Sequence, residues 1–262
     1  MRTNRWIGAG MLLLYAAAPM TSNAQATPDA ENGVGNIFRA LFGPNWNVFA
    51  HGGLSTNGRF LLQDATSIGG GQRALKTEDA FNVGVGAGVD LLPRTGLRLS
   101  YTFMNSDLVF RTDKGDGSEI FDVDDGGTLQ GHAAAIELLR YMLPPQSFIT
   151  PYASAGLVGT WWVLDEESGM VAASGGSTQF RLGALASFGF QAALGDGFSA
   201  RIEVASASVR NPFTGNESFE AFGGSTIDEP GRVNRTDFRL AVLYSFGKRE
   251  TSYSSNGQRQ VR

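Results

Sequence analysis

The chain has 262 residues, 21 basic and 25 acidic side chains, a formal net charge of −4 and no cysteine. An acidic balance without a basic stripe argues against a nucleic-acid partner, and the lack of cysteine excludes disulfides and thiolate metal sites. The 35 glycines and 18 phenylalanines are a high content for a soluble domain. Glycine and aromatic residues are instead frequent in membrane β-barrels.

The first 26 residues have the pattern of a secretory signal peptide. Arg2 and Arg5 form a basic start, residues 7–18 form an apolar run, and Ala24–Ala26 has the small-x-small pattern of a cleavage site. The apolar run is shorter than the ~20 residues that a membrane-spanning helix needs. The sequence therefore predicts export through a cleaved signal peptide, over residues 1–26.

Residues 27–44 form a short leader whose apolar side chains follow helical spacing. These are Val34, Ile37, Phe38, Leu41 and Phe42. The spacing allows a short amphipathic helix, either on the periplasmic membrane surface or in the mouth of a barrel. A poorly ordered periplasmic leader is the alternative.

Beyond the leader, eight candidate β-strands follow in order. They cover roughly residues 45–55, 79–91, 97–106, 129–141, 149–163, 178–194, 198–209 and 234–246. The connections between them are alternately long and short, beginning with a long one. Tight turns on one side and long loops on the other are typical of outer-membrane barrels with an even number of strands. The fold class predicted for residues 45–246 is therefore all-β, an eight-stranded antiparallel up-and-down transmembrane β-barrel with external long loops.

The strands alternate between an apolar face and a face of glycine and polar residues. In the hairpin 79–103, the apolar face begins with Phe81, Val83 and Val85, and the opposite face carries Asn82, Gly84 and Gly86. A period of two indicates β-strands. In a soluble sandwich the apolar face would form the core, whereas in a membrane barrel it faces lipid. The alternation of loop lengths favours the barrel over a soluble periplasmic sandwich.

The predicted strands and the segment Pro151–Gly156 resemble the small outer-membrane β-barrel superfamily, which includes the OmpA transmembrane domain, OmpX and the Opa adhesins. The final strand is similar to the family's terminal signal for the barrel assembly machinery. The matching residues are Phe238, Leu240, Val242, Tyr244 and Phe246. The resemblance implies the architecture but no single activity. Unlike the family pattern, the chain continues after its last aromatic residue, with a polar tail over 247–262 that we predict to be disordered.

Seven ionisable residues fall on the predicted inner face of the barrel. They are Arg98, Glu137, Arg181, Arg201, Glu203, Asp237 and Arg239. Because the interior of an eight-stranded barrel is just wide enough for its own side chains, we interpret them as a mutually paired structural network. Within it, Arg201 and Glu203 are expected to pair. A path for small solutes is the alternative.

The two histidines, His51 and His132, are the candidates for hydrolysis or acyl transfer. Outer-membrane lipid-modifying barrels use a histidine with a serine and a carboxylate, and His51 shares a strand face with Ser55. Four residues of strand span about 13 Å, which is too far for a direct hydrogen bond between nucleophile and base. The sequence therefore predicts no enzyme.

The acidic segment 112–127 resembles the start of a calcium loop, with Asp122 and Asp124 before Gly127. Ala133 stands where such a loop needs a glutamate. A solvated acidic loop is thus the preferred interpretation, and neither a metal nor a cofactor is predicted.

Aromatic residues near the predicted membrane boundary suit an interfacial belt. These are Tyr101, Phe103, Phe110, Trp161 and Trp162. The expected partners are outer-membrane lipid and lipopolysaccharide, the barrel assembly machinery during biogenesis, and an extracellular ligand at the outer loops. The predicted function is a structural or surface-interaction role through those loops. A narrow porin-like channel and a lipid-modifying enzyme are the alternatives.

Overall fold

The computed structural model describes residues 46–65, 71–92, 94–113, 122–123, 127–143, 147–165, 178–213, 226–228 and 230–246. These residues belong to one compact unit, 36–262. The predicted signal peptide, the leader and the polar tail lie outside the described residues. In the part of the chain that the structure describes, no helix is long and apolar enough to cross a bilayer.

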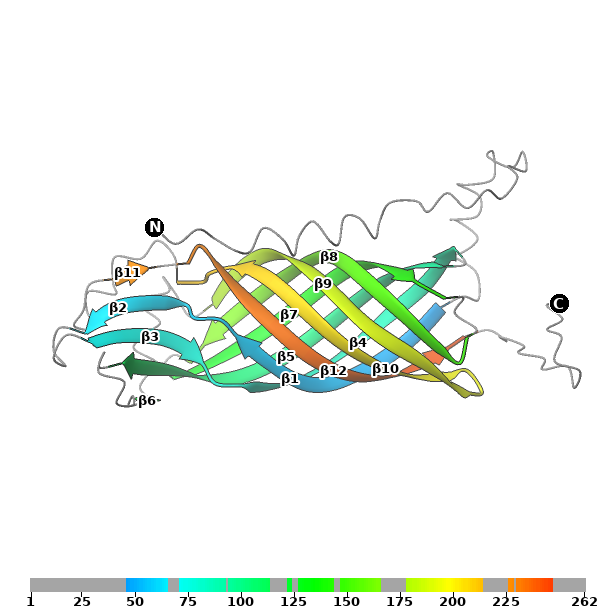
Figure 1. Ribbon diagram of the computed structural model, residues 1–262, viewed down its shortest axis with the longest axis horizontal. Coiled ribbons are helices and arrows are strands. Elements are labelled where there is room, and N and C mark those ends of the chain that lie inside the picture. Colours follow the sequence, from blue (N-terminus) through cyan, green and yellow to red (C-terminus); the bar gives the residue numbers. More distant parts are fainter. Residues whose placement is uncertain are drawn as a thin grey trace, which may run out of the picture. The chain divides into compact units, whose positions relative to one another are not determined.

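Eight long strands form a closed antiparallel barrel, as predicted (Figure 1). They are β1 (Trp46–Asn57), β4 (Ala80–Leu92), β5 (Thr95–Asp113), β7 (Thr128–Tyr141), β8 (Ile149–Leu164), β9 (Thr178–Gly195), β10 (Phe198–Arg210) and β12 (Arg232–Ser245). Each strand pairs with the next, and β12 returns to pair with β1 from Asn47↔Ser245 to Asn57↔Arg235. Closure leaves no barrel strand with an unpaired edge.

The connections at one end of the barrel are short. Between β9 and β10 the chain turns at Gly195, Asp196 and Gly197, which have φ values of 105°, 49° and 85°. Positive φ is accessible to glycine and is tolerated by aspartate, so this sequence can form a very tight turn. The connections at the opposite end are longer, in the alternation that the sequence predicts.

Four further strands, which the sequence analysis did not predict, occupy the long connections. They are β2 (Leu61–Ala65), β3 (Gly71–Thr77), β6 (Asp122–Val123) and β11 (Thr226–Asp228). β3 pairs with the end of β5 from Thr77↔Leu108 to Gln72↔Asp113, and β2 pairs with β3 and β11. The sheet therefore continues beyond the closed barrel at the long-loop end, where Figure 1 shows β2, β3 and β11 together.

The barrel is apolar outside and polar inside. On β12, Phe238, Leu240 and Val242 are 54%, 60% and 55% exposed, whereas Asp237 and Arg239 are 0% and 6% exposed. A water-soluble protein has the opposite distribution. An outer wall of large apolar side chains is stable in lipid, and a closed barrel satisfies its own backbone there. The protein is a transmembrane β-barrel.

The interior is filled in three layers. An apolar layer lies toward the short turns and includes Phe49, Leu139, Tyr141 and Leu243. A charged layer follows in the middle of the barrel. The third layer is an apolar cluster toward the long connections, to which Phe60, Leu61, Leu75, Met104, Leu108, Phe110, Leu129, Trp162, Phe213 and Val233 contribute.

Candidate functional site

Arg98 on β5 joins three strands in the centre of the barrel. Its guanidinium makes two hydrogen bonds to Glu137 on the neighbouring β7, from Nε to Oε1 at 3.0 Å and from Nη2 to Oε2 at 2.6 Å. Its Nη1 also donates to Glu203 Oε2 at 2.6 Å. β10, which carries Glu203, lies four strands from β5 in either direction around the barrel. The Arg98–Glu203 ion pair therefore crosses the interior from wall to wall.

Glu203 is the point where most of these bonds meet. Besides Arg98, its carboxylate accepts hydrogen bonds from Tyr152 Oη at 2.6 Å and from Arg239 Nη1 at 3.3 Å. Arg239 continues the network to Asp237, which also pairs with Arg235. All six side chains are buried. Alternating charges of opposite sign offset the cost of removing each charge from water.

Arg201 does not pair with Glu203, so the expected pairing is wrong. Arg201 Nη2 donates to Gln191 Oε1 at 2.9 Å, and its guanidinium carbon lies 5.6 Å and 4.9 Å from the ring centroids of Phe49 and Tyr152. Residues 201 and 203 share a face, but successive inward positions on one strand are about 7 Å apart. Arg201 therefore packs against the aromatic rings, while Glu203 pairs with Arg98 on the opposite wall of the barrel.

Arg181 lies apart from the charged layer, at the long-connection end of β9. It is partly buried and donates to the backbone carbonyls of Phe180 at 3.2 Å, Pro212 at 3.3 Å and Asn211 at 3.4 Å. Its assignment to the central network is wrong because alternation defines the face of a residue but not its depth in the barrel. The structure brings together Arg98, Glu137, Glu203, Asp237 and Arg239.

Several network members were absent from the sequence-based set. Arg235 shares the inward parity of Asp237 and Arg239, so the alternation could have included it. Ser154 Oγ donates to Glu137 Oε2 at 2.6 Å, and Ser187 Oγ accepts a hydrogen bond from Arg98 Nη2 at 3.4 Å. The sequence contains no comparable signal for the uncharged members. A buried serine can be assigned to the network only once the structure shows which charged side chain lies opposite it.

Two cavities beside the charged layer are very small. Both border Arg98 and Arg201, and each has a volume of about 10 Å³. This is close to the minimum room for one water molecule. The same region leaves Arg201 Nε, Arg201 Nη1 and Arg239 Nε without a protein acceptor, and a single water in each cavity could serve them.

The two histidines lie in different environments. His51 Nε2 is 3.2 Å from Thr102 Oγ1 inside the barrel, and His132 Nδ1 is 2.7 Å from Tyr101 Oη on the outer wall. Ser55 donates instead to Asp237 Oδ1 at 2.6 Å. Among the described residues, neither histidine shares a hydrogen bond with a serine, and no cluster of three or more metal-ligating side chains occurs. Most of the acidic segment 112–127 lies outside the described residues.

The predicted aromatic belt is divided between two faces. Trp161 is exposed and its ring centroid lies 4.7 Å from that of Phe180, while Trp162 is buried in the interior apolar cluster toward the long connections. Phe110 is also buried inside. Neighbouring strand residues point to opposite faces, so Trp161 and Trp162 cannot both face lipid. The residues of the proposed assembly signal all point outward, and their recognition by the assembly machinery stays a prediction.

No protein-family model and no curated protein sequence matches the chain. Solved structures with a similar fold include the Neisserial surface protein A, at 13% identity and a TM-score of 0.45, over 77% of this chain and 97% of that one. OprG from Pseudomonas aeruginosa is 14% identical with a TM-score of 0.47, over 77% and 96%. The N-terminal β-barrel domain of Pseudomonas aeruginosa OprF is 14% identical with a TM-score of 0.41, over 78% and 99%.

Proposed function

We propose that this protein is a closed, non-conducting outer-membrane barrel with a structural or surface-interaction role. The observation that carries the proposal is the Arg98–Glu203 ion pair, which crosses the interior at 2.6 Å. Both charges are buried, and each has further partners in the same layer. Opening a water path here would separate ion pairs that stabilise one another.

A second closure lies toward the long connections. The rings of Phe60, Trp162 and Phe213 are at most 3% exposed and meet edge to face, with Phe60 6.0 Å from Trp162 and 5.4 Å from Phe213 between centroids. Asn211 Nδ2 holds this plug by donating to Phe60 O at 2.6 Å. Polar solutes would therefore meet two barriers along the barrel, the apolar plug near the long connections and the charged layer in the middle.

The extension of the sheet supports the second half of the proposal. β2 and β3 continue the wall of β5 past the barrel, and polar side chains at their base, including Glu78, Asp79 and Asp107, are exposed. Loops and sheets held by a rigid barrel are suited to recognition. We infer that this extension carries the surface that other molecules contact.

The protein refolded in a planar lipid bilayer is expected to show no unitary conductance, because both closures persist in the folded state. Refolding is verified beforehand by the heat-dependent shift in gel mobility that intact barrels show. Reproducible current steps from verified protein would contradict a closed barrel and would support the narrow channel instead.

Labelling of single cysteines tests the proposed orientation, in which the sheet extension faces outward. Because the chain has no cysteine, Glu78→Cys and Arg94→Cys each create a unique thiol, at opposite ends of the barrel. Both native side chains are exposed, so the pair is matched. In intact cells, a membrane-impermeant maleimide is expected to label Glu78→Cys and to label Arg94→Cys only after lysis. The reverse pattern would contradict the orientation.

A further inference from the structure

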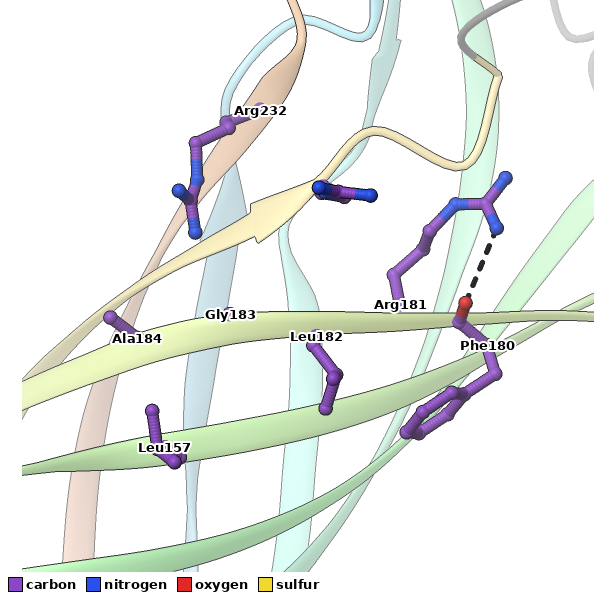
Figure 2. Close-up of a pocket in the computed structure, with 8 residues that line it drawn as sticks. Leu157, Phe180, Arg181, Leu182, Gly183, Ala184 and Arg232 are labelled. Atoms are coloured by element: carbon purple, nitrogen blue, oxygen red, sulfur yellow. Dashed lines mark hydrogen bonds between the residues drawn. The ribbon is translucent and has the colours of Figure 1, made fainter.

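A hollow bordered by Arg181 lies at the long-connection end of the barrel wall. Its volume is about 700 Å³, and it is lined by residues of β8, β9, β10 and β12 (Figure 2). These are Leu157, Phe180, Arg181, Leu182, Gly183, Ala184, Arg210 and Arg232. Three arginines and a group of apolar side chains thus border one space, and none of these lining residues is acidic.

The three arginines occupy the ends of adjacent strands. Arg210 lies directly opposite Arg232 in the pairing of β10 with β12. Arg181, on β9, reaches the backbone carbonyl of Asn211, immediately after Arg210. Like charges directly opposite one another destabilise a sheet. Within the described ranges, Arg181 and Arg232 donate to backbone carbonyls, and none of the three guanidinium groups forms an ion pair with a carboxylate.

Apolar side chains that face the membrane continue from the arginines along the wall. Leu157 and Leu182 are 65% and 61% exposed, and Phe180 is 45% exposed. Figure 2 shows Leu157, Leu182 and Phe180 on one side of the hollow and Arg232 and Arg181 on the other. A molecule that satisfies both groups has an anionic head and hydrocarbon chains.

We propose that this hollow binds a phosphorylated lipid of the outer leaflet, with lipid A of lipopolysaccharide as the representative compound. Arg210 and Arg232 would bind the phosphate, because a guanidinium matches phosphate oxygens in a bidentate geometry. Arg181 adds positive charge beside them, and the acyl chains lie along Leu157, Leu182 and Phe180. The assignment to the outer leaflet rests on the proposed orientation of the barrel.

Native mass spectrometry of the full chain, refolded in detergent and mixed with lipid A, tests the site. The double variant Arg210→Gln/Arg232→Gln is expected to bind lipid A about tenfold more weakly than the unmodified protein, since two charge-assisted contacts are lost. The matched control is Arg94→Gln/Arg140→Gln, two exposed arginines at the opposite end. The control is expected to bind lipid A normally, and every variant is first shown to be folded by the gel-mobility shift.

Two further probes identify the chemistry that is bound. Dephosphorylated lipid A is expected to bind no better to the unmodified protein than to the Arg210/Arg232 variant. Equal affinity of the two proteins for lipid A, or full retention of the dephosphorylated lipid, would overturn the proposal. If inorganic phosphate at the same concentration displaced lipid A completely, the proposal that a lipid occupies the hollow would be overturned. The conductance and cysteine-labelling experiments test the proposed function without added lipid A. A failure of the proposed function can therefore be distinguished from a failure of lipid binding.

Discussion

Replacing Glu203 by glutamine is expected to lower the free energy of unfolding by about 3 kcal/mol, because the change leaves buried arginines without a counter-charge. Glutamine keeps the shape of the side chain but removes the charge that Arg98 and Arg239 share. The measurement is urea unfolding in lipid vesicles, followed by the gel-mobility shift. A loss below about 1 kcal/mol would contradict the role assigned to this carboxylate, since exposed ion pairs contribute no more than that.

Two variants separate this effect from a general loss of charge. Glu78→Gln removes an exposed carboxylate at the end of the barrel and is expected to leave stability within about 0.5 kcal/mol. In the double variant Glu203→Gln/Arg239→Gln, Asp237 keeps Arg235 as its partner. The double variant is therefore expected to be at least about 1 kcal/mol more stable than the sum of its single losses. Strict additivity would show that Glu203 and Arg239 do not stabilise each other.

Gly53→Ala is expected to destabilise the barrel by about 3 kcal/mol, or to prevent its refolding, because a Cβ at this position has no room. It would lie 1.8 Å from Phe238 O and 2.8 Å from Phe238 C on the paired strand β12. These are backbone atoms, which no change of rotamer can move. The strands must separate, and the pairing that closes the barrel between β1 and β12 is lost locally. The measurement is again urea unfolding followed by gel mobility.

The neighbouring residue is the matched control. Among the described residues, the atom nearest to a Cβ at Gly52 would be Asn82 O at 3.8 Å, which is ordinary van der Waals contact. Gly52→Ala is expected to be neutral or to stabilise by up to about 1 kcal/mol, because alanine restricts the unfolded chain. Equal effects of the two substitutions would mean that strand propensity, and not the approach of β12, governs this part of β1.

Alternation made most of the barrel predictable from the sequence. Phe238, Leu240 and Val242 face lipid and Asp237 and Arg239 face inward, as their parity predicts. The short connections could be placed from turn residues such as Gly195–Gly197, whose conformations are restricted by local geometry. These features depend on neighbours along the chain, so a single sequence contains the necessary information.

The outer strands were not predictable in the same way. β2 and β3 are five and seven residues long, and their pairing depends on β5, more than 30 residues further along the chain. Phe60, Leu61 and Leu75 are fully buried only because this pairing brings them over the barrel. A short apolar run by itself does not distinguish such a strand from a loop.

The sequence by itself determined the β-class, the closed eight-stranded barrel and the face of most charged residues, because a period of two couples each position to one side of the wall. Only the tertiary structure decided which of those charges meet. Glu203 pairs with Arg98 across the barrel, and Arg181 lies at the end of the wall beside Arg210 and Arg232. Depth and partner depend on strand register and stagger around the whole ring, which no local pattern contains.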